Sequence, residues 1–188
     1  MTAAEPAVDN IIDDLRVRCS EGALSEFEIA MYNKRAQNLL NSMPIIAYCA
    51  LGILGFIEKN ETKMRKNHLE SIRLATETRR LPGLFMFNFG CSLCGMGYAE
   101  EGADYLFKAY EHDKTNLRHL NSAIIGAYQA DDQRLDYLLE QWAKLNEGEP
   151  HPIVEEIEDA EEALEALKSI ETEGTVSWKQ VKAECKLQ

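Results

Sequence analysis

The chain has 188 residues, 45% of them hydrophobic, and a formal net charge of −12. This length is sufficient to bury a sizeable core, whereas general nucleic-acid binding and attachment to an anionic membrane both need a basic footprint that the charge balance excludes. We therefore expect neither nucleic acid nor a membrane among the partners of this protein.

The N-terminal segment, residues 1–22, contains one short amphipathic stretch at Ile11–Val17. We expect this segment either to form a docking helix or to be partly disordered, as chain ends often are. Ser25 then begins a helix, because Glu28 three residues later completes a capping box. That helix is predicted to run to about Leu40.

Two helices, Pro44 to about Glu58 and Asn60 to Arg80, are predicted to pair as a hairpin. The first begins with a proline, which suits the first turn of a helix, and it is apolar nearly all round, so it should be the most buried helix. The second is rich in lysine and arginine. Those charges either solvate a helix face or form a patch that steers an acidic partner or the acidic tail of the chain itself.

The stretch 83–116 divides into two amphipathic halves that meet at Gly97. Both halves carry apolar or small residues at the three-and-four spacing of one helix face, and a glycine between them tolerates the positive φ of a helix end. A second pair, Leu117–Ala130 and Asp132–Leu145, follows with the same spacing. Strand-like alternation is absent from the pattern, so we predict an all-α fold.

Within 83–116, the residues Asn88-Phe89-Gly90, Gly97, Gly102, Ala109 and Asp113 stand out by their spacing. At these spacings the stretch resembles a tetratricopeptide repeat, a helical hairpin of about 34 residues. The consensus tryptophan and proline positions hold other residues, and the flanking hairpins match less well. The resemblance implies stacked hairpins whose first helices line a concave groove that binds a protein or peptide.

The first helix of this hairpin carries three aromatic residues that are candidates for that groove: Phe85, Phe87 and Phe89. Residues two apart point about 200° from each other on a helix, so we expect at least one of the three at the groove or surface. The groove implied by the resemblance consists of Phe85 and Phe89 with Asn88 and Asn121, whose amides would bind an extended peptide.

The composition changes at 146–152, where prolines and a glycine stand among charged residues and mark a boundary. Beyond it lie an apolar stripe with an acidic face, Val154–Ile170, then a Glu-Gly pair, a Thr-Val-Ser-Trp turn and a Val-Lys-Ala-Glu helix. This order resembles the C-terminal segment of some addiction-module antitoxins, which wraps the cognate toxin. Trp178 and Val181 are the candidate contacts to a partner. The alternative is a solvating cap helix of the array.

Chemistry-bearing residues give little support to catalysis. Cys91 and Cys94 form a CxxC pattern that lies within a predicted helix rather than at its N-terminus, where a dipole would lower the thiol pKa. Phosphate-binding loops, HExxH and nucleophile elbows are absent from the sequence. We therefore predict no enzyme activity, no cofactor and no metal, and keep a redox or metal protein using Cys91 and Cys94 as the alternative class.

Together these patterns predict an N-terminal segment at 1–22, a tetratricopeptide-like antiparallel α-hairpin array at 23–147, and an acidic hinge with a C-terminal helical tail at 148–188. We expect a non-enzymatic scaffold or adaptor that binds a protein or peptide, with a basic partner at the acidic tail as one option. A toxin inhibitor and a type III secretion translocator chaperone are the alternatives. An odd number of cysteines and the absence of a signal-like start favour the cytoplasm. A homo-oligomer is compatible with the sequence.

Overall fold

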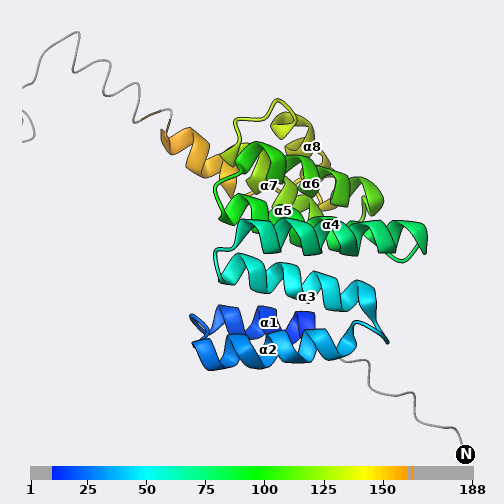
Figure 1. Ribbon diagram of the computed structural model, residues 1–188. Coiled ribbons are helices and arrows are strands. Elements are labelled where there is room, and N and C mark those ends of the chain that lie inside the picture. The colour runs from blue at the N-terminus through cyan, green and yellow to red at the C-terminus, as the bar shows by residue number, and fades with distance from the viewer. Residues whose placement is uncertain (1–9, 161, 163–188) are drawn as a thin grey trace, which may run out of the picture.

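The computed structural model describes residues 10–160 and residue 162, and every element of this part is helical, which confirms the all-α prediction. A further helical segment spans 153–160. The labelled helices (Figure 1) are α1 (Ile11–Ser20), α2 (Glu26–Leu39), α3 (Pro44–Ile57), α4 (Glu61–Glu77), α5 (Pro82–Gly95), α6 (Ala99–His112), α7 (Leu117–Gln129) and α8 (Leu135–Leu145).

Local sequence signals set the N-terminal ends of α2, α3 and α4. Ser25 and Glu28 form the predicted capping box at the start of α2. Pro44 lies in the first turn of α3, where its missing N–H is not needed. Asn60 caps α4 by accepting a hydrogen bond from the backbone N–H of Lys63. These ends were predictable because each depends only on residues within one helical turn.

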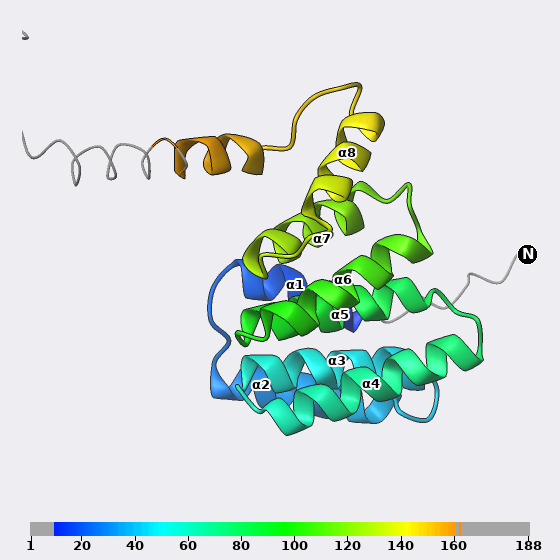
Figure 2. The same ribbon diagram turned by 90° about the horizontal axis from the view of Figure 1, so that it is seen from above.

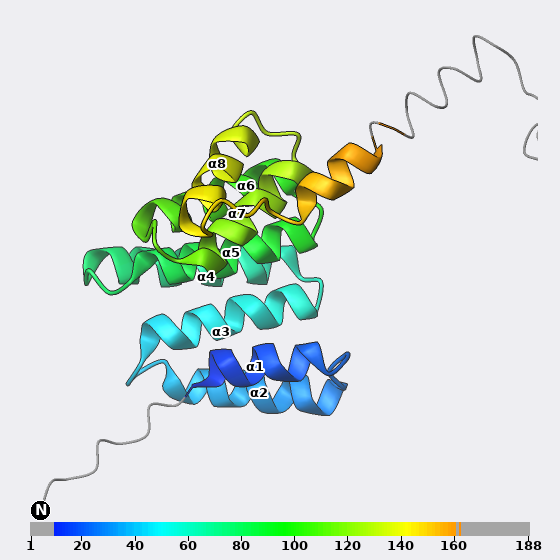
Figure 3. The ribbon, with the colours of Figure 1, turned by 180° about the vertical axis from the view of Figure 1, so that it is seen from behind.

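The helices pack as successive antiparallel pairs, α3 with α4, α5 with α6 and α7 with α8. The pairs stack in chain order (Figure 2), and α1 and α2 lie together beyond α3 (Figure 3). The first helices of the pairs begin at Ile11, Pro44, Pro82 and Leu117, which are 33, 38 and 35 residues apart. This near-regular spacing is compatible with a helical repeat, and α1 packs against α3 and α2 at one end of the array.

Glycines allow the paired helices to approach closely. A Cβ added at Gly55 of α3 would lie 2.5 Å from the backbone nitrogen of Met64 in α4. In the next pair, a Cβ at Gly102 of α6 would lie 2.4 Å from the sulfur of Cys94 in α5. Because helices can come this close only where a side chain is nearly absent, these two glycines fix the spacing of the first two pairs after α2.

The core surrounds α5, so the three phenylalanines of this helix are all largely buried. Phe85, Phe87 and Phe89 are 6%, 5% and 0% exposed, so none of them lies on the surface. Phe85 packs with residues of α1 to α4, Phe87 with residues of α6 to α8, and Phe89 with Met64. Opposite faces of α5 are both buried because this helix has neighbours on several sides. Of the three rings, Phe85 also lines a cavity, which is described below.

The chain after α8 returns to the array. Gly148, with φ of +91°, lies in the turn, and His151 and Ile153 are then buried against α7 and α8. The predicted boundary at 146–152 is therefore a turn whose far side belongs to the core. None of the helices in the described ranges is long and apolar enough to cross a membrane.

Candidate functional site

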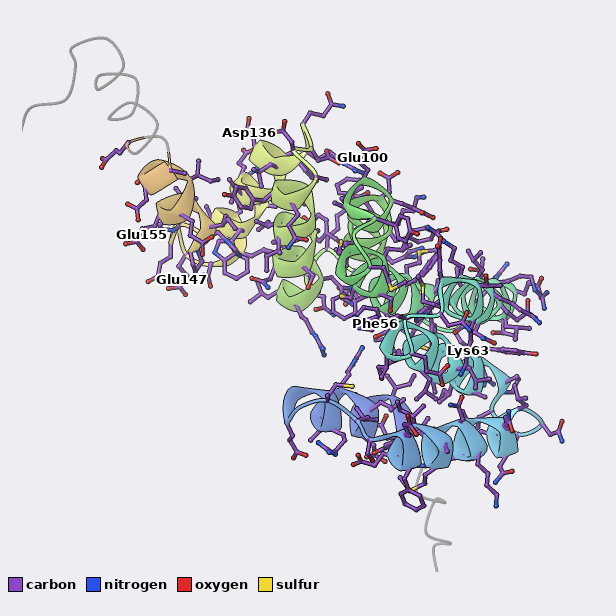
Figure 4. The ribbon with its side chains drawn as sticks, turned by 60° about the vertical axis from the view of Figure 1, so that its left-hand side comes forward. Phe56, Lys63, Glu100, Asp136, Glu147 and Glu155 are labelled. Carbon is purple, nitrogen blue, oxygen red and sulfur yellow. The ribbon has the colours of Figure 1, made fainter. Side chains whose placement is uncertain are left out.

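The first helices of the pairs form the inner side of an arc. α1 contacts α3, α3 contacts α5, and α5 contacts α7. Figure 4 shows α1 and α7 facing each other across the open side of this arc, while Glu100 of α6 and Asp136 of α8 lie on the outer side. We call the surface of α1, α3, α5 and α7 that faces this opening the inner face.

A cavity of about 840 Å³ lies at one end of the inner face, between α1, α3, the end of α4 and the start of α5. Most of its lining is apolar, with Ile12, Ile45, Leu84 and Phe85 among the contributing residues. Such a volume and lining are typical of a site for a small ligand or for the anchoring side chain of a peptide. Arg16 also lines this cavity.

Arg16 of α1 connects the cavity with the centre of the inner face. Its Nη2 donates a hydrogen bond to Oδ1 of Asn88 in α5 at 2.5 Å, and its Nη1 lies 3.3 Å from Oδ1 of Asp13. The guanidinium carbon also lies 5.7 Å from the centroid of the Phe87 ring. Burial, together with the positive charge of Arg118, lowers the pKa of Arg16 from its ordinary value.

Arg118 at the start of α7 approaches the same aromatic ring from the other end of the arc. Its guanidinium carbon lies 5.0 Å from the Phe87 centroid, within the range of a cation–π interaction, and its side chain is exposed. Sequence analysis missed both Arg16 and Arg118, because residues so far apart in the chain give no local signal that they meet.

The side-chain amides of the predicted groove residues Asn88 and Asn121 already form hydrogen bonds within the chain. Asn88 donates to the carbonyl oxygen of Leu84 as well as accepting from Arg16. Oδ1 of Asn121 accepts a hydrogen bond from Nε2 of His151 at 2.8 Å.

Among the aromatic candidates, Phe85 reaches the cavity lining, whereas Phe89 is fully buried beside His68 and Tyr105. The structure thus brings Phe85 and Asn88 to the inner face next to Arg16 and buries Phe89 away from it. Trp178 and Val181 lie outside the described residues.

Cys91 and Cys94 lie in the last turns of α5, and the thiols of Cys19, Cys49, Cys91 and Cys94 are free. The Cys91 side chain is accessible to solvent but lies in the concave inner face, where burial and the nearby Cys94 raise its pKa to about 11. Burial also raises the pKa of Cys94. Both thiols are therefore protonated near neutral pH, which does not favour nucleophilic or redox chemistry. No metal-binding group of His, Cys, Asp or Glu occurs among the described residues.

Two buried histidines complete the surroundings of α5. His68 is stacked on Phe89 and His119 on Phe87, and the Nδ1 atom of each is buried without a hydrogen-bond partner. Burial lowers the pKa of His119, and it lowers that of His68 to about 3. Both rings are therefore neutral at physiological pH and pack as aromatic groups, so the positive charge of this region belongs to the arginines.

Comparison with known proteins gives no relative: no protein-family model, no curated protein sequence and no solved structure matches the chain. Because no relative suggests a function, the candidate functional site is defined by the inner face and its cavity alone.

Proposed function

We propose that this protein is a non-enzymatic protein-binding module of tetratricopeptide type that holds a segment of a partner protein against its inner face. The observation that carries the proposal is the cavity of about 840 Å³, which opens on the inner face beside Arg16. Apolar pockets next to charged groups are typical anchoring sites for peptide side chains. The near-regular helix spacing and the resemblance at 83–116 support the same type of module.

The free thiols support a reducing compartment, which is the reason to propose a cytoplasmic location.

Substitution at the cavity tests the proposal. Leu81 lines the cavity and is 76% exposed, so Leu81→Glu should place a charge at the cavity without disrupting the core. Leu69 of α4 is 45% exposed and is not part of the cavity lining, which makes Leu69→Glu the matched control. Proteins captured by the full-length chain from native extract should be lost with Leu81→Glu and retained with Leu69→Glu. Retention by both variants would contradict the proposal.

The acidic C-terminal segment offers a second binding element, that of the inhibitor alternative. His151 and Ile153 belong to the core, so a truncation that tests this segment must preserve them. A chain ending at Glu162 meets this condition, whereas one ending at Glu149 also removes packing from α7 and α8. A partner that binds full-length protein but not the chain ending at Glu162 would assign recognition to residues 163–188 and favour the inhibitor.

A further inference from the structure

Two arginines from opposite ends of the arc share one aromatic ring. The guanidinium carbons of Arg16 and Arg118 lie 5.7 and 5.0 Å from the Phe87 centroid, so they are at most 10.7 Å apart. The two charges act on each other, because the positive charge of Arg118 contributes to the lowered pKa of Arg16. The arrangement therefore creates a local site of positive charge on the inner face of a chain whose net charge is −12.

The positive charge of Arg16 and Arg118 has fewer carboxylate contacts than that of Arg65 in α4. Arg65 is held by Glu61 and Glu101, each at 2.7 Å. In contrast, no carboxylate in the described part of the chain lies within 4.0 Å of Arg118, and Arg16 has only the Asp13 contact at 3.3 Å. An exposed guanidinium without an acid offers a planar set of donors that matches a carboxylate.

The site of positive charge adjoins an apolar space. Arg16 lines the cavity together with Ile12, Leu84 and Phe85, and the same side chain reaches Asn88 and the ring of Phe87. If one side chain of a peptide filled the cavity, the adjacent residues of that peptide would therefore lie close to Arg16 and Arg118. The hydrogen bond to Asn88 holds the Arg16 side chain in this position, which reduces the entropy lost on binding.

We infer that the inner face recognises an acidic and apolar segment of a partner protein, with a bulky apolar side chain in the cavity and a nearby carboxylate between Arg16 and Arg118. This inference rests on the proposed function and specifies the partner. It is opposite in sign to the basic partner that the overall charge predicts. The net negative charge does not prevent it, because at physiological salt charges more than about 8 Å apart are largely screened.

A displayed library of random dodecapeptides is the probe, and the full-length protein is the bait. We expect enriched peptides to carry aspartate or glutamate within a few positions of a bulky apolar residue. One enriched peptide and its Asp→Asn or Glu→Gln analogue are then synthesised. Their affinities are measured by calorimetry for the unmodified protein, for Arg118→Gln, and for Lys66→Gln, which removes an exposed charge from α4 outside the cavity lining.

The acidic peptide should bind Arg118→Gln about tenfold more weakly or worse, the loss expected for one charged hydrogen bond. Lys66→Gln should bind like the unmodified protein. The amide analogue should bind weakly to the unmodified protein. It should lose little further affinity with Arg118→Gln, because the peptide carboxylate that would contact Arg118 is already absent.

Two further results would count against these ideas in different ways. Enriched peptides that lack acidic residues, or that bind independently of Arg118, overturn the inference and leave the proposed function in place. Failure to enrich any peptide, with circular dichroism confirming that the bait is folded, contradicts the proposed function as well.

Discussion

Acidification should destabilise the fold through His68. This ring is fully buried in α4, its Nε2 lies 3.1 Å from Oγ of Ser92, and Ser92 donates to the carbonyl oxygen of Asn88. Nε2 therefore carries the proton that is donated to Ser92, and Nδ1 is left with a buried lone pair that has no partner. A second proton on Nδ1 would place a positive charge in apolar surroundings, which is why burial lowers the pKa to about 3.

The size and sign of the effect follow from this pKa. An unfolded histidine titrates near pH 6.5, so the native protein binds fewer protons than the unfolded chain between pH 6.5 and about 3. The stabilisation by the neutral ring is complete above pH 6.5 and is lost as the pH falls through this interval. At about 1.4 kcal/mol per pH unit, His68 should reduce the free energy of unfolding by roughly 2 kcal/mol between pH 7 and pH 5.

Urea unfolding followed by circular dichroism at both pH values measures this loss. His68→Gln keeps a side-chain donor toward Ser92 and cannot titrate, so its stability should fall by roughly 2 kcal/mol less than that of the unmodified protein. Ser92→Ala is the control: it retains the histidine and should retain the pH dependence, although it lowers stability at pH 7. An equal loss in the unmodified protein and in His68→Gln would refute the reasoning.

Three further predictions concern glycines and the segment after α8. Gly55→Ala should lower the free energy of unfolding by about 1 to 3 kcal/mol in urea titration, because the new Cβ would meet the backbone of Met64; unchanged stability would show that α3 and α4 can separate without cost. Gly97→Ala should cost only about 1 kcal/mol in the same assay, since its φ of +90° is unfavourable for alanine but the space is open. A larger loss than for Gly55→Ala would contradict this ranking. His151→Ala should reduce hydrogen-exchange protection of the Ile153 amide, which donates to Nδ1 of His151 at 3.1 Å; unmodified protein should show the same change as the pH falls below 6.5, because burial lowers the pKa of His151. Protection that persists in both cases would contradict a role for this ring in docking the segment.

The helices and their pairing could be predicted because their signals are local. Ser25, Pro44 and Gly97 each act within one turn of the backbone, and the predicted pairs 44–80, 83–116 and 117–145 correspond to α3–α4, α5–α6 and α7–α8. The sequence left two alternatives for α1, a docking helix or a partly disordered segment, because Ile11–Val17 is too short to show whether it packs. Its burial depends on surfaces of α3 and α5 that only the folded array creates.

The site was less predictable than the fold. Asn88 and Phe85 were selected from the resemblance, and both do lie at the inner face, but their surroundings come from α1. Periodicity along α5 could not reveal that Phe87 is covered on both sides, nor that Arg16 and Arg118 converge on it. Such convergence results from the curvature of the array, which depends on the packing of every pair and is not encoded in any single segment.

The bond between Arg16 and Asn88 joins residues 72 positions apart, whereas a linear array makes contacts only between adjacent units. A chain segment must therefore close a long loop before α1 can dock, and loop closure of this kind slows folding and is expected to come late. Once formed, the Arg16–Asn88 bond connects the first unit to the third. Thermal unfolding of α1 should therefore also destabilise the middle of the array. The molecule should for this reason melt more cooperatively than an open solenoid of the same length.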